Sequence, residues 1–310
     1  MLASSAMPES ASDQIAYPRG YTASQLVALD HFRDGLGQAV VELLQTHRDL
    51  PKRVRYVADI QRFMLSHAAM ALHFEHTLDH TQPGVTATNL LKFFEGTPAA
   101  SKNTVLAFLI EMRHYNFVEP IEDGNRRSRS FCATPDTEAL MRFYFDLHLR
   151  ALDVMDGGNR VAISSANPNL LHHAHPRFAR LILHSEGWRK PPETVSGFTK
   201  SDSGSSVIHD LASRAPRHVT GSEPIWIGQV SATEVAKRYV VSTTHTVRLF
   251  ARAKAQGLIG WKGSTNRGEC WISPELVRAY HLWQAEKFSA ISQAMQAACE
   301  ATGVNPSPEA

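Results

Sequence analysis

The stretch "SKNTVLAFLIEMRHYNFVEPIEDGNRRSRSFCATPD", residues 101–136, combines the signals of a helix, a turn and a hairpin. Its apolar residues recur at helical spacing between Ser101, which suits a helix N-cap, and Asn116, which tolerates the left-handed conformation that ends many helices. Strand-like FVEPIE and SRSFCA flank the turn-forming DGNRR. A short amphipathic helix is expected just before, over 85–96. A short helix, a longer helix and a basic hairpin in this order predict a winged helix-turn-helix.

The same order returns 141 residues later in the chain. At this offset Ser101 aligns with Ser242, and Asn116 aligns with Gly257, the residue type best suited to a left-handed position. The pattern predicts an internal duplication of one structural unit. The second copy comprises a short helix at 230–240, a longer helix at 242–261 and a hairpin at 262–273.

The rest of the chain is mostly helical in its pattern, so the predicted fold class is mainly α with small β-hairpin wings. Apolar spacing predicts long packing helices at 24–46, 52–78, 136–155 and 275–301, and a further helix at 175–188. Loop composition predicts an irregular connecting region. The predicted division is a disordered tail at 1–20, a helical region at 21–155 with the first winged module at 85–133, a connecting region at 156–203, the second module at 204–302 with its core at 230–273 and a C-terminal helix, and a tail at 303–310.

Residues 103–136 resemble the DNA-binding core of the MarR family of bacterial regulators. The likeness lies in the Thr-Val start, the leucines at helical spacing, the arginine-bearing wing and the threonine that enters the next helix. It extends over roughly 54–155 and, less closely, over 205–290. This chain departs from the family in having Asn116 at the usual glycine, and two modules in one chain where family members form homodimers of one module each.

The resemblance implies sequence-specific binding to duplex DNA and regulation of transcription. A helix-turn-helix places its second helix in the major groove, and its wing reaches the backbone or the minor groove. Net charge is only +2, so the basic surface must be local. The expected DNA contacts are Ser101, Lys102, Asn103, Thr104, Arg126, Arg127 and Arg129 in the first copy, and Thr243, Thr244, His245, Arg248, Arg252, Lys262, Asn266 and Arg267 in the second.

The resemblance also implies a small-molecule effector between the long helices and the winged module. The expected walls of that site are Phe63, Met64, His67, Phe143 and Tyr144.

Two other functions fit the pattern. Leu106 and Ile110 are apolar on the outward face of the first long helix, which suits a protein–protein adaptor. Two winged modules in one chain also suit a plasmid-type replication initiator. Catalysis is not expected, since no nucleophile elbow, P-loop, H-E-x-x-H or dinucleotide fingerprint is present.

The cysteine and histidine patterns do not predict a disulfide or a metal site. Cys132, Cys270 and Cys299 stand far apart, and no leader-like start or bilayer-length apolar run is found, so we expect a cytoplasmic protein without cofactor or metal. The histidine-rich tracts at 73–80 and 171–175 have spacings that suit a metal, but we interpret them as an exposed helix end and a loop.

The sequence is compatible with two modes of assembly. The long helices of one chain can pack on each other, giving a monomer with two unlike DNA-contacting helices about one DNA turn apart, ~34 Å. Alternatively, the apolar stripe of the helix at 275–301 joins two chains into a homodimer.

Overall fold

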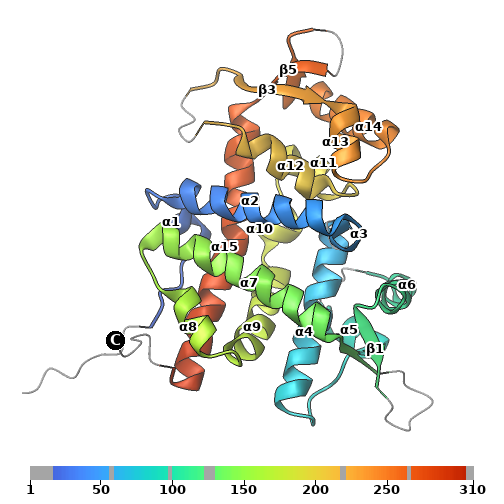
Figure 1. Cartoon of the computed structure of the whole chain (residues 1–310), viewed down its shortest axis with the longest axis vertical. Helices are drawn as coiled ribbons and strands as arrows, with labels where there is room; N and C mark the ends of the chain where they lie inside the picture. Colours follow the sequence, from blue (N-terminus) through green and yellow to red (C-terminus); the bar gives the residue numbers. More distant parts are fainter. Residues whose placement is uncertain are drawn as a thin grey trace, which may run out of the picture.

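The computed structural model describes residues 17–55, 59–96, 100–121, 130–216, 221–263 and 267–304. In this part of the chain the fold is mainly helical, with one two-stranded and one three-stranded antiparallel sheet. Helix α15 (Pro274–Thr302) runs along the molecule and joins its two ends (Figure 1). Ser273 caps its start by accepting the Leu276 N–H, and Gly303 ends it in the left-handed conformation.

The helices around α15 form the core. Helix α9 (Leu170–His184) packs against both α15 and α4 (Ile60–Leu78), and α2 (Phe32–Asp49) packs against α7 (Pro135–Asp156). This confirms that the long helices pack on each other within one chain. The apolar stripe of α15 belongs to that core, so it is not an exposed face for joining two chains. Its buried members are Leu276, Val277, Tyr280, Trp283, Phe288, Ile291 and Met295.

The first repeat follows α4 and projects from one side of this core (Figure 1). It comprises α5 (Ala87–Phe93), α6 (Lys102–His114), β1 (Val118–Pro120) and β2 (Phe131–Ala133). The two strands are antiparallel, with Val118 opposite Ala133, and Val85 adds a single bridge to Phe131. The turn between the strands, 122–129, lies outside the described residues.

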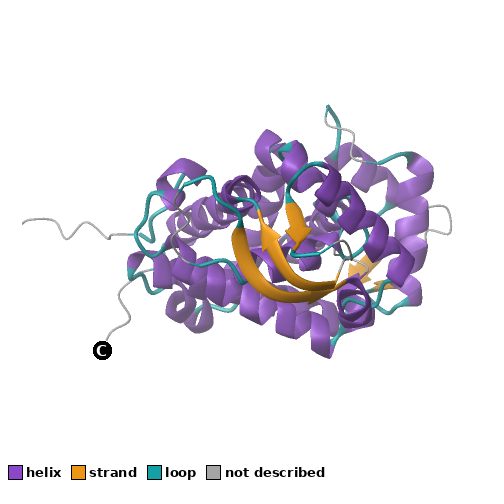
Figure 2. Ribbon diagram, turned by 90° about the horizontal axis from the view of Figure 1, so that it is seen from above, coloured by secondary structure: helices purple, strands orange, loops and turns teal. Residues whose placement is uncertain are grey.

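The second repeat lies at one end of the molecule, at the top of Figure 1. Its order is α12 (Gly204–Ser213), β3 (Ile225–Ser231), α13 (Ala232–Arg238), α14 (Thr243–Ala255), β4 (Ile259–Trp261) and β5 (Arg267–Ile272). Strand β5 lies between β3 and β4, and the long curved strands lie over the helical body (Figure 2). A register shift between Trp226 and Gly228 coincides with a φ of 81° at Gly228, a bulge that glycine accommodates.

The two repeats share hydrogen bonds as well as order. Asn116 and Gly257 have φ values of 58° and 68°, so the predicted left-handed positions are confirmed. The next N–H in each case reaches back five residues, from Phe117 to the Met112 carbonyl (2.8 Å) and from Leu258 to the Ala253 carbonyl (2.9 Å). The two segments therefore leave their long helices in the same way.

Three sequence expectations are wrong. The region 156–203 is more regular than expected: α9 and α10 (Glu186–Arg189) correspond to the helix expected at 175–188, but α8 (Arg160–Ala166) and α11 (Glu193–Thr199) were not expected. Val195 and Phe198 explain α11, since one helical turn brings both into the core. The tail does not extend to residue 20, because the Gly20 N–H donates to Gln296 Oε1 (2.8 Å) and the Arg19 carbonyl accepts from Arg160 (2.9 Å). The tract 171–175 is not a loop but part of α9.

Two expected helices are each divided. The helix at 24–46 consists of α1 (Ala23–Val27) and α2, and the helix at 52–78 consists of α3 (Pro51–Arg55) and α4. Asp59 accepts the Arg62 N–H (2.8 Å) and so starts α4 anew. Within the described ranges, no helix is both long enough and apolar enough to cross a membrane.

Candidate nucleic-acid interface

Helix α6 presents the residues expected to contact DNA in the first repeat. Its start is held by Ser101, whose Oγ accepts the Thr104 N–H (3.2 Å). The buried face anchors the helix through Val105, Phe108, Leu109 and Met112. Lys102 and Asn103 are consequently exposed in the first turn, and Thr104 is half-buried beside them. The outward face continues into apolar residues, with Leu106 at 40% and Ile110 at 71% exposure.

Helix α14 is built the same way but has a more polar outward face. The Ser242 Oγ accepts the His245 N–H (3.1 Å), and the buried face consists of Thr246, Leu249, Phe250 and Ala253. Thr243, Thr244 and Arg248 are exposed from the first two turns. These are hydroxyl and guanidinium donors at the end of the helix that a helix-turn-helix presents to base edges.

The two arginines of α14 differ in whether their side chains have a hydrogen-bond partner. Arg252 donates to the Ser201 Oγ (3.2 Å), which ties its guanidinium to the segment after α11. Arg248 is exposed and makes no hydrogen bond or ion pair with any described residue. His245 is half-buried, and its Nε2 has no partner in the described part. Arg248 is therefore the side chain of α14 best placed to reach a partner molecule.

The hairpin residues are described only in the second repeat. Arg267 is exposed at the start of β5, opposite Ser231. Lys262 pairs with Glu269 (3.4 Å), but both are well exposed, so the pair contributes little and leaves the ammonium available. Asn266 and the predicted wing arginines Arg126, Arg127 and Arg129 lie outside the described residues.

The charge around the second repeat is positive. Residues 224–287 contain nine Lys or Arg and four Asp or Glu, whereas 83–136 contain six of each. Asp210, which precedes this range, pairs with Arg238 at the end of α13 (2.6 Å) and with Arg214 (2.9 Å), so it neutralises one of the nine positive charges. Neither of these ion pairs involves Arg248.

The histidine tracts form no metal site among the described residues. His73 is buried, with Nε2 2.7 Å from Glu138 and Nδ1 accepting the Ala133 N–H (3.3 Å). It therefore connects α4 to α7 and β2, which corrects its assignment to an exposed helix end. His175 is also buried, with Nε2 3.0 Å from Nδ1 of His67.

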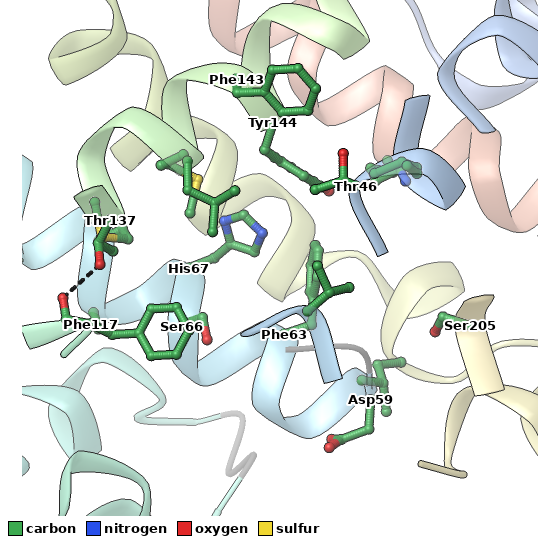
Figure 3. Close-up of a pocket in the computed structure, with 18 of the residues that line it drawn as sticks. Thr46, Asp59, Phe63, Ser66, His67, Phe117, Thr137, Phe143, Tyr144 and Ser205 are labelled. Carbon is green, nitrogen blue, oxygen red and sulfur yellow. Dashed lines mark hydrogen bonds between the residues drawn. The ribbon is translucent and has the colours of Figure 1, made fainter. Parts of the chain in front are cut away.

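A cavity of about 190 Å³ lies between the long helices and the first repeat (Figure 3). Four of the five residues expected around an effector line it: Phe63, His67, Phe143 and Tyr144. Met64 is buried elsewhere in the core. Lys287 also lines the cavity from α15, which was not expected from the sequence. The sequence feature that could have indicated its burial is its position on the apolar stripe of that helix, four residues after Trp283 and four before Ile291.

Neither protein-family models nor curated proteins nor solved structures include a match to this chain. The function is therefore inferred from the geometry of α6, α14 and the cavity.

Proposed function

We propose that this protein binds duplex DNA sequence-specifically and regulates transcription through two winged helix-turn-helix modules. Each module would consist of one of the two repeats, with α6 and α14 as the helices that enter the major groove. The observation that carries the proposal is the outward face of α14. Thr243, Thr244 and the unpaired Arg248 project from its capped N-terminal half, backed by a positively charged hairpin.

Specificity would come mainly from the second module. An arginine can donate two hydrogen bonds to guanine, and a threonine can donate to a base edge or contact a thymine methyl. Arg267 and Lys262 would contact phosphates and so add affinity without sequence preference. Lys102 and Asn103 offer a smaller polar surface in the first module.

A second function is favoured for α6 by a separate observation. Ile110 and Leu106 expose apolar surface where a DNA-contacting helix normally carries polar groups. A protein partner on α6 would make the first repeat an adaptor, while α14 binds DNA. Exposed isolated apolar residues are common, so this alternative is placed second.

Fluorescence anisotropy with labelled duplexes tests the proposal. A site selected from random DNA should bind at least a thousandfold more tightly than random duplex at equal salt. Arg248→Ala should weaken binding to the selected site by roughly 1–3 kcal/mol and relax one base position. Arg177→Ala, which removes an exposed arginine of α9, serves as the matched control.

Two outcomes would contradict the proposal. The first is an absence of duplex binding at low salt, where phosphate contacts are strongest. The second is an equal loss for Arg248→Ala on selected and random DNA, which would limit Arg248 to phosphate contact. If DNA binding persists while Ile110→Glu abolishes capture of a protein partner, α6 has the adaptor role.

A further inference from the structure

Two tryptophans reach the surface of the three-stranded sheet, and they are neighbours on it. Of the five tryptophans in the chain, Trp188, Trp261 and Trp283 are buried. Trp226 is 54% exposed, and Trp271 is half-buried. The two are direct cross-strand partners in β3 and β5, so their side chains project from the same face of the sheet. Tryptophan is a mostly buried residue type, so a pair of them at the surface indicates a binding face.

The face that carries this pair points away from the protein core. In β5 the residues on either side of Trp271, Cys270 and Ile272, are fully buried, so Trp271 projects to the opposite side. Figure 2 shows the sheet lying over the helical body. Gly260, the partner of Trp271 in β4, lies directly under the indole, because an added Cβ would be 2.4 Å from Trp271 Cζ2. The glycine therefore lets the ring lie across β4 in a fixed place.

Positively charged side chains lie farther along the same face. Arg267 is four residues before Trp271 in β5, so it projects from the same side, and it is exposed. Lys262 follows β4 and donates its N–H to the Glu269 carbonyl (3.0 Å). The carboxylate of Glu269 pairs with the Lys262 ammonium (3.4 Å), but both groups are well exposed, so the pair is weak. The face thus combines two indoles with two cations that can accept other anionic partners.

This combination suits a chain of bases and phosphates. Every nucleobase has a flat face that can stack on an aromatic side chain, and the phosphates between bases are attracted to lysine and arginine. In a duplex the bases are stacked on one another, so their flat faces are not available to Trp226 and Trp271. A single strand can splay its bases outward onto such side chains. The face is therefore complementary to unpaired nucleotides.

We propose that the outer face of this sheet binds single-stranded nucleic acid, with unpaired bases stacked on Trp226 and Trp271 and phosphates contacting Lys262 and Arg267. Bases and phosphates are common to DNA and RNA, so the chemistry is shared by both. The inference goes beyond the proposed duplex binding and does not depend on it, because the tryptophans project from the sheet and not from α14.

Fluorescence anisotropy at low salt tests this face with labelled oligothymidylate and oligouridylate of about 12 nucleotides. Each stacked base is expected to strengthen binding by roughly 5- to 150-fold. The wild-type protein should therefore bind at least one of these strands about fivefold or more tightly than an abasic strand of the same length and charge. The tighter of the two identifies DNA or RNA as the partner.

Trp226→Ala should weaken binding to the base-bearing strand roughly 5- to 150-fold and leave binding to the abasic strand unchanged. Trp226→Phe keeps an aromatic ring and should retain most of the affinity. Leu282→Ala is the matched control, because Leu282 is 50% exposed but belongs to α15. Glu269→Gln removes a negative charge from the face and should tighten binding to both strands, a gain that misfolding cannot produce.

Three results would overturn the inference: no binding of either oligonucleotide to the wild-type protein, equal binding of the abasic strand, or unchanged affinity for the base-bearing strand in Trp226→Ala. The first two use only the wild-type protein, so they decide the matter even if the variant does not fold. A selected duplex is titrated in parallel, and an equal loss on it in Trp226→Ala would also count against a single-strand site. Because the duplex is measured separately, failure here is distinct from failure of the proposed function.

Discussion

Asn116 and Gly257, 141 residues apart, both leave a long helix with a left-handed backbone, at φ values of 58° and 68°. The residue after each of them donates its N–H to a carbonyl five residues earlier in the chain. A short strand begins at the following residue. The equivalence of these two residues lets the same substitution be compared in both repeats.

Replacing either residue by alanine should destabilise the protein. At Gly257 an added Cβ costs about 1 kcal/mol or more in the left-handed region, and at Asn116 alanine lacks the short polar side chain that lets asparagine adopt this region. Asn116→Ala and Gly257→Ala should each lower the free energy of unfolding by about 1 kcal/mol in urea denaturation. Gly37→Ala is the control, because Gly37 is inside α2 at ordinary φ with open space around its Cβ position, so alanine should stabilise there. If Gly37→Ala lowered the free energy of unfolding as much as Gly257→Ala does, this explanation would be contradicted.

Val240 is strained in the turn between α13 and α14. Its φ of 54° is unfavourable for a β-branched side chain. Val240→Gly should therefore raise the free energy of unfolding by roughly 0.5–1 kcal/mol. Val247→Gly is matched to it, since the two valines are 39% and 40% exposed. Val247 is in the interior of α14, so its replacement should cost about 1 kcal/mol, and thermal unfolding of both variants measures the contrast.

The wing arginines of the first repeat should act on DNA affinity through phosphates. Arg126→Ala combined with Arg127→Ala should weaken binding to all duplexes equally. Each lost phosphate contact should reduce the slope of log affinity against log salt concentration by about 0.9. Anisotropy titrations at several salt concentrations measure this slope. A slope identical to that of the wild-type protein would show that these arginines do not contact DNA phosphates.

Stability should fall as the solution becomes acidic, because several histidines are buried neutral. Burial lowers the pKa of His47 to about 4, that of His281 to about 4 and that of His175 to about 3, from an ordinary value of 6.5. Below pH 6.5 the unfolded chain binds protons that the folded protein excludes. The stabilisation is thus complete above about pH 6.5, and it decreases by up to ~1.4 kcal/mol per pH unit for each histidine between there and pH 4.

Urea denaturation between pH 7 and pH 4 checks this dependence. His47→Asn keeps a group able to bond to the Ser206 hydroxyl, which is 2.8 Å from His47 Nδ1, but does not titrate. The variant should show a shallower loss of stability with falling pH, whatever its stability at pH 7. The exposed His173→Asn is the control. Equal pH slopes for wild type and His47→Asn would contradict the assignment.

The assembly of the chain is testable by light scattering. The apolar stripe of α15 is buried inside the chain, so we expect a monomer of 34.4 kDa. A monomer with unlike helices α6 and α14 should select an asymmetric DNA site. A mass near twice the value for one chain, together with a palindromic selected site, would overturn this prediction.

Much of the local structure could be predicted from short-range signals. Ser101 and Ser242 cap their helices through bonds to N–H groups three residues ahead, and Asn116 ends its helix through its own backbone preference. Such features involve atoms a few residues apart, so composition and spacing reveal them. Spacing also located both repeats. The MarR resemblance, not the spacing, placed five residues around an effector, and four of these, Phe63, His67, Phe143 and Tyr144, line the cavity.

Other features depended on contacts between distant segments. Helix α11 was expected to be a loop because of its serine and glycine content, yet Val195 and Phe198 find a buried place beside α12, α14 and α15. His73 and His175 were expected to be solvent-exposed, but packing of α4 against α7 and α9 encloses them.

The sequence by itself determined the helical class, the order of the two repeats and the ends of their helices, because each of these follows from neighbouring residues. Only the tertiary structure decided that α15 is the internal axis and that Lys287 faces a cavity. A helical stripe indicates which face is buried but not what it is buried against. The environment of Lys287 is created by Tyr144 and Trp188, which are 143 and 99 residues away in the chain.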